Sequence, residues 1–93
     1  MELTKKQLSW LRSQAHPLAP LLQLGKAGIS EAFVEQLTDA LERQELVKVR
    51  LGKLVEVDPQ EIAARVDAQL IQKVGRMLVY FRRSTEPKLE LPR

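Results

Sequence analysis

The stretch Leu21-Leu22-Gln23-Leu24-Gly25-Lys26-Ala27-Gly28-Ile29-Ser30 predicts a buried strand, a glycine-containing loop and the start of a helix. Leu21–Leu24 is a short apolar run of strand length, and Gly25 follows it directly. Ser30 is a preferred helix N-cap residue, and apolar residues recur at helical spacing after it. We therefore expect a strand that leads through a short loop into a helix over 30–43.

A second strand and helix follow in the same order. Leu46–Leu51 alternates apolar and basic side chains, which is typical of a strand with one buried face. Asp58 suits a helix N-cap, Pro59 suits the first helical position and Glu61 suits the third. These signals predict a helix that runs from there to about Ala68.

The two ends of the chain complete the fold. Residues Thr4–Gln7 form a capping-box pattern, so a first helix is expected to begin there and to end before Pro17. Two β-rich runs, 70–74 and 77–82, flank Gly75 and predict a hairpin. Strands that alternate with helices are parallel neighbours, and the hairpin adds an antiparallel strand. The order α-β-α-β-α-β-β thus predicts an α/β sandwich with a mixed four-stranded sheet.

Length and composition limit what the protein can be. The chain has 93 residues, and we expect one domain over 1–84 with an extended tail over 85–93. There is no cysteine and one histidine, so we expect no disulfide, no metal site and no cofactor. No apolar run approaches the ~20 residues that span a membrane, and no signal peptide is recognisable. A cytoplasmic protein is the expectation.

Catalytic motifs are missing from the sequence. There is no GxSxG elbow, no HExxH zinc motif and no nucleotide-binding phosphate loop. His16 stands beside a proline, without an acid and a nucleophile arranged around it. Four of the twelve carboxylates fall in the helix expected over 30–43, where a solvated face explains them. We therefore expect neither an enzyme nor a small-molecule substrate.

Charge is sorted along the chain, although the formal net charge is only +3. Residues 30–45 carry five acids and one base, whereas 46–55 carry three bases and 70–83 carry four, both without an acid. A solvated surface is the simplest interpretation of such charges. The sorting nevertheless predicts one positive side on the domain, and such a side attracts polyanions.

Gly25-Lys26-Ala27-Gly28 is a candidate phosphate-binding loop, because it joins a strand to a helix start. Glycines let the backbone approach a ligand, the helix start offers free N–H groups, and Lys26 adds a cation. A simple chain turn is the alternative interpretation.

Basic residues elsewhere form the second set of candidates. If Val47 and Val49 face the core, Lys48 and Arg50 face away from it. In the last strand Tyr80 shares a face with flanking arginines and could stack on a base, or lie over aliphatic stems on a solvated face. A basic stripe also lies on the first helix. The RNA-binding candidates are Gly25, Lys26, Ala27, Gly28, Lys48, Arg50, Arg76, Arg82, Lys5 and Arg12.

Several segments match one known pattern when they are taken in order. They are Ala15–Leu18, Leu24–Glu31, Ala40–Glu42, Glu45–Arg50, Val74–Gly75 with Leu78–Val79, and Lys88–Arg93. In these segments the chain resembles the CRM-domain family of RNA-binding proteins, in its stand-alone bacterial YhbY-like form. The resemblance implies a fold similar to the C-terminal domain of bacterial translation initiation factor three. It also implies RNA binding through the GxxG loop, which is compared with that of KH domains, and association with large-subunit precursors.

The closing strand departs from the family pattern. That pattern reads Leu-Tyr-Arg-Pro, whereas this chain has Tyr80-Phe81-Arg82-Arg83. The tyrosine is displaced by one residue, which turns its ring to the opposite face of the sheet. Whether Tyr80 or Phe81 stacks on a base therefore stays open.

These observations predict a non-enzymatic, monomeric RNA-binding protein. We expect it to bind ribosomal RNA during large-subunit assembly, through the GKAG loop and a basic sheet face that includes Lys48, Arg50, Arg76 and Arg82. The alternative is a protein-interaction module, in which the acidic helix over 30–43 docks a ribosomal protein.

Overall fold

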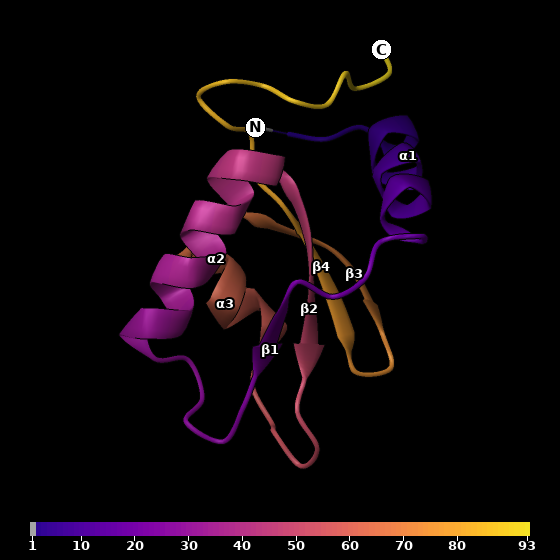
Figure 1. The fold of residues 1–93 in the computed structure, drawn as a ribbon. Coiled ribbons are helices and arrows are strands. Elements are labelled where there is room, and N and C mark those ends of the chain that lie inside the picture. Colours follow the sequence, from indigo (N-terminus) through magenta and orange to yellow (C-terminus); the bar gives the residue numbers. More distant parts are fainter. Residues whose placement is uncertain (1) are drawn as a thin grey trace.

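The computed structural model describes residues 2–93, which form one sheet with helices on both faces (Figure 1). The sheet has four strands in the order β1-β2-β4-β3; β1 and β2 are parallel, and the other neighbours are antiparallel. The predicted order of elements and the mixed sheet are confirmed. The elements are α1 (Lys5–Ala15), β1 (Leu22–Leu24), α2 (Glu31–Gln44), β2 (Leu46–Leu51), α3 (Pro59–Arg65), β3 (Gln69–Val74) and β4 (Met77–Phe81).

Each helix begins where its capping residue predicts. The side chains of Thr4, Ser30 and Asp58 accept hydrogen bonds from backbone N–H groups in the first turns of α1, α2 and α3. The helix α3 ends at Arg65, earlier than the sequence indicates, because Asp67 turns the chain with a φ of 53°. None of the helices within residues 2–93 combines the length and the apolar character needed to cross a membrane.

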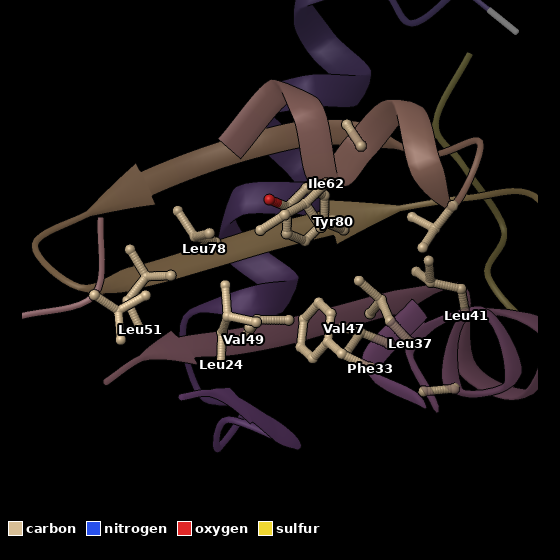
Figure 2. Close-up of a cluster of buried hydrophobic side chains, with 14 residues drawn as sticks. Leu24, Phe33, Leu37, Leu41, Val47, Val49, Leu51, Ile62, Leu78 and Tyr80 are labelled. Carbon is tan, nitrogen blue, oxygen red and sulfur yellow. The ribbon is translucent and has the colours of Figure 1, made fainter. Parts of the chain in front are cut away.

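Two hydrophobic cores lie on opposite faces of the sheet. In the larger core, α2 and α3 cover Val47 and Val49 of β2, which pair with Tyr80 and Leu78 of β4 (Figure 2). The smaller core lies beneath α1, so α1 covers part of the sheet face that the sequence analysis assigned to RNA. The buried members of the smaller core are Leu11, Ala15, Leu46, Ile71, Val79 and Phe81.

The C-terminal segment, residues 85–93, contains no helix or strand and runs from the end of β4 towards α1 (Figure 1). Glu45 is fully buried, and its carboxylate accepts a hydrogen bond from the backbone N–H of Leu89 at 2.8 Å. Further along, the side-chain nitrogen of Gln7 donates to the carbonyl oxygen of Pro92 at 3.0 Å. The segment is therefore held both at the end of α2 and at the start of α1.

Candidate RNA interface

The GKAG loop, residues 25–28, forms a tight turn between β1 and α2. The N–H of Gly28 donates to the carbonyl oxygen of Gly25 at 3.0 Å. Gly28 has a φ of +73°, which residues with side chains rarely adopt, whereas Gly25 has no positive φ and has open space around it. Backbone geometry therefore requires a glycine only at Gly28. Lys26 and Ala27 are exposed at the tip of the loop.

The loop that follows β2, residues 52–58, lies beside the GKAG loop (Figure 1). The two loops meet because each follows the carboxyl end of a strand and these strands, β1 and β2, are parallel neighbours. The N–H of Gly52 donates to the carbonyl oxygen of Leu24 at 2.8 Å, and a Cβ on Gly52 would lie 3.0 Å from that oxygen. Glycine thus permits the loop after β2, which we call the second loop, to pack closely on the end of β1.

A groove of about 300 Å³ separates the two loops; we call it the loop groove. It is lined by Lys26 and Gly28 from the GKAG loop and by residues 53–57 from the other. Lys26 and Lys53 are both exposed. The end of the sheet therefore presents a concave surface with a lysine on each side.

Arg76 holds the second loop in place. Its guanidinium donates to the carbonyl oxygens of Leu51 at 3.4 Å, of Val55 at 2.7 Å and of Gly52. The prediction that Arg76 shares an outward sheet face with Lys48 is wrong, because its guanidinium is turned towards these loop carbonyls. Arg76 is thus a positioning residue for the loop groove.

Lys48 and Arg50 point away from the larger core, as the alternation of β2 predicts. They lie on the α1 face of the sheet, where Lys48 pairs with Val79 and Arg50 pairs with Met77. The Nζ atom of Lys48 donates to the carbonyl oxygen of His16 at 3.4 Å, just beyond the end of α1. Arg50 is exposed and stands two residues before the second loop. Arg50 therefore adds a positive charge near the end of β2 that leads into the second loop, outside the lining of the loop groove.

Arg82 does not join this surface. Because β4 is antiparallel to β2, Arg82 follows the end of β4 that lies farthest from the loops, where its N–H donates to the carbonyl oxygen of Glu45 at 3.0 Å. The predicted sheet face that combines Arg82 with Lys48 and Arg50 is therefore wrong. Strand direction and parity place Arg82 at the opposite end of the sheet.

Neither aromatic residue of β4 is available for stacking. Tyr80 is fully buried in the larger core, and its hydroxyl donates to the carbonyl oxygen of Pro59 at 2.9 Å (Figure 2). Burial raises the pKa of this hydroxyl well above its usual range. Phe81 is buried in the smaller core. The expectation that Tyr80 stands among outward-facing arginines is wrong, because its face of β4 packs against α2 and α3.

The α1 candidates lie outside the loop groove. Arg12 is exposed, and its Nε atom donates to the carbonyl oxygen of Ile71 on the edge strand β3 at 3.3 Å. Lys5 is exposed in the first turn of α1, the end that contacts the C-terminal segment. The structure therefore brings Lys26 and Arg50 to one end of the sheet but places Lys5 elsewhere.

Lys53 is the residue of this surface that sequence reasoning missed. Lys53 is one of the three bases of residues 46–55, but nothing in the local sequence distinguishes it from the other lysines. The signal that could have found it is topological. Loops that follow parallel neighbouring strands meet at one edge of a sheet, so Lys53 and Lys26 belong together.

Comparison with known proteins gives relatives that match almost the whole chain. A family model, the CRS1/YhbY (CRM) domain, matches residues 3–82. The probable RNA-binding protein YqeI of Bacillus subtilis is 39% identical over 95 residues, covering 97% of this chain and 99% of YqeI. An RNA-binding protein of Haemophilus influenzae is 34% identical, covering 98% of this chain and 96% of that protein.

The fold also matches a solved structure. A Staphylococcus aureus protein, determined in solution, superimposes with a TM-score of 0.77 at 41% identity, covering 98% of this chain and all of that chain. This match confirms the predicted α/β architecture, and the family match confirms the prediction of a non-enzymatic domain. Three findings agree: the ordered segments that resemble the family, the sheet topology and the nearly complete coverage. The chain belongs to the CRS1/YhbY (CRM) domain family.

Proposed function

We propose that this protein is a cytoplasmic, monomeric RNA-binding protein whose target is ribosomal RNA in precursors of the large ribosomal subunit. One observation carries the proposal: Lys26 and Lys53 line the groove between the GKAG loop and the loop after β2, and Arg50 is exposed on β2 two residues before the second of these loops. Phosphate contacts supply much of the affinity for nucleic acids, and a positive cluster on one side favours them. The names of the two relatives support RNA rather than another polyanion.

The proposed binding relies on phosphate contacts and shape rather than on stacking by β4. Tyr80 and Phe81 are buried, so neither ring reaches a base. The loop after β2 is held to the end of β1 by the N–H of Gly52 and to the turn before β4 by Arg76. A surface held in this way loses little conformational freedom on binding, which favours affinity.

The alternative interface, the acidic helix α2, has fewer free carboxylates than its sequence indicates. Glu42 accepts hydrogen bonds from the Ser84 hydroxyl at 3.0 Å and the Thr85 N–H at 2.9 Å, while Glu45 is buried. This observation favours RNA over a basic protein partner. The acids of α2 that are exposed are Glu31, Glu35 and Asp39.

Crosslinking in cells, followed by sequencing of the bound RNA, tests the proposed target. We expect the reads to fall on large-subunit ribosomal RNA. We also expect the protein to sediment with large-subunit precursors and to leave them as the salt concentration rises, because phosphate contacts are salt-dependent. Sedimentation only with mature small subunits, or with no ribosomal particle, would contradict the proposal.

A further inference from the structure

The loop groove contains an apolar side chain that phosphate binding does not use. Leu54 is 85% exposed and adopts a φ of +66°, which aliphatic residues rarely take. The next residue, Val55, is buried, and its carbonyl oxygen is bound by Arg76 at 2.7 Å. The loop therefore holds Leu54 outward in a strained conformation, and its exposed aliphatic side chain beside the groove is available to a ligand with an apolar surface.

The loop groove also contains a carboxylate that opposes phosphate binding. Glu56 lines the groove together with Lys26 and Lys53. It is exposed and makes neither a hydrogen bond nor an ion pair within the described part of the chain, residues 2–93. A carboxylate repels phosphate, but it accepts hydrogen bonds from N–H groups. The edges of unpaired bases carry such donors, and proteins read single-stranded RNA by bonding to them.

We propose that the loop groove binds one unpaired nucleotide of the RNA and prefers guanine. This inference rests on the proposed function and names the part of the RNA that the groove takes. Lys26 and Lys53 bind the flanking phosphates, and Leu54 packs against the face of the base. Glu56 accepts hydrogen bonds from the edge of the base.

The choice of guanine follows from the chemistry of Glu56. Guanine presents two adjacent donors, N1–H and the N2 amino group, which match the two oxygens of one carboxylate. Adenine and cytosine present one amino group beside a ring nitrogen that is an acceptor. Uracil presents a single N3–H between two carbonyl oxygens that repel a carboxylate. The size of the groove, about 300 Å³, suits a single nucleotide rather than a duplex.

Four short labelled single-stranded RNAs, identical except for G, A, C or U at one central position, provide the probes. Fluorescence anisotropy with the full chain measures their affinities. We expect the guanine strand to bind tightest and the uracil strand weakest. The variant Leu54→Asn should bind all four strands less tightly, on the order of tenfold, because one aliphatic contact is lost. Its thermal midpoint should stay equal or rise, since asparagine tolerates a positive φ better than leucine.

Glu56→Gln separates recognition of a base from simple repulsion. If Glu56 reads the base, the variant loses the preference for guanine. If it only repels phosphate, the variant binds all four strands more tightly by the same factor, and the inference is overturned. Glu35→Gln removes an exposed carboxylate from α2 and is the matched control, with no expected effect.

The two proposals fail in distinguishable ways. If the wild-type chain binds no ribosomal RNA at all, the proposed function fails. If it binds ribosomal RNA but binds the four strands equally, and Leu54→Asn leaves those affinities unchanged, only the nucleotide site is rejected.

Discussion

The Nη2 atom of Arg76 donates a hydrogen bond to the carbonyl oxygen of Val55 at 2.7 Å, and this bond ties the turn between β3 and β4 to the loop after β2. The same guanidinium also reaches the carbonyl oxygens of Leu51 and Gly52. In the sequence Arg76 looks like a phosphate contact, but in the structure its guanidinium donates hydrogen bonds to loop carbonyls. We therefore expect Arg76 to affect RNA binding indirectly, by holding the loop that forms one side of the loop groove.

We predict that Arg76→Ala lowers the free energy of unfolding by about 1–3 kcal/mol, because several loop carbonyls lose a charged donor. Arg76→Lys should recover only part of this loss, since an ammonium lacks the planar fork of a guanidinium. Urea unfolding measures both effects, and Lys73→Ala on the exposed edge of β3 is the control. An Arg76→Ala variant that keeps full stability but loses RNA binding would make Arg76 a phosphate contact instead.

The two glycines of the GKAG loop should respond differently to the same substitution. Gly28→Ala places a Cβ at a φ of +73°, so we predict a loss of about 1 kcal/mol or more, and a larger loss for Gly28→Val. Gly25→Ala meets open space at an ordinary φ and should be nearly neutral. Thermal unfolding of the matched pair checks this prediction, and equal effects at the two positions would refute it.

We predict that the buried carboxylate of Glu45 holds the C-terminal segment against the end of α2 and so stabilises the fold. It accepts hydrogen bonds from the N–H groups of Ser84 and Leu89, each at 2.8 Å, and Arg83 lies 3.4 Å away. Glu45→Gly would relieve a φ of 64° but would leave buried N–H groups without an acceptor. We expect a net loss of at least about 2 kcal/mol in urea unfolding, at 1–3 kcal/mol for each unsatisfied group.

Glu86→Gln is the control for Glu45→Gly. It removes an exposed carboxylate of the same segment that forms a surface ion pair with Lys88, and such pairs contribute little. A Glu45→Gly variant as stable as wild type would show that relief of backbone strain outweighs the lost hydrogen bonds.

Acid should release the C-terminal segment from α2. Hydrogen bonds from the side chain and the N–H of Thr85, and then from Ser84, lower the pKa of Glu42 from 4.5 to about 2. A carboxyl group whose pKa is depressed in the folded state stabilises it fully above the unfolded value and loses that effect as the pH falls through the folded value. The contact should therefore weaken between about pH 4.5 and pH 2.

The NMR shift of the Thr85 amide, followed against pH, measures this release. Glu42→Gln should abolish the transition because the variant has no proton to take up. A Thr85 amide that titrates identically in the variant would assign the transition to a different carboxyl group.

Local patterns in the sequence predicted the elements well but not the contacts between distant ones. From Val47 to Arg50 the alternation of β2 identifies the face of the larger core, because the opposite face carries basic residues there. Leu46, on that opposite face, is buried in the smaller core. Residues Met77–Phe81 of β4 are apolar on both faces, so alternation could not decide which face Tyr80 occupies. The structure buries both faces, one beneath α1 and the other beneath α2 and α3.

The role of Glu45 could not be predicted because the partners of its carboxylate are 38 to 44 residues away in the chain. The position of Lys53 required the strand order. Capping residues such as Ser30, by contrast, act within one turn, so the sequence reveals them directly.

The salt dependence of affinity for large-subunit ribosomal RNA tests the central claim most directly. Each phosphate contact to single-stranded RNA contributes about 0.7 to the slope of log K against log salt. The double variant Lys26→Ala, Arg50→Ala should flatten this slope by on the order of one unit. The matched control Arg43→Ala, Arg65→Ala removes two exposed charges from the last turns of α2 and α3 and should leave the slope unchanged. If the control flattens the slope and the variant of Lys26 and Arg50 does not, RNA binds elsewhere on the molecule.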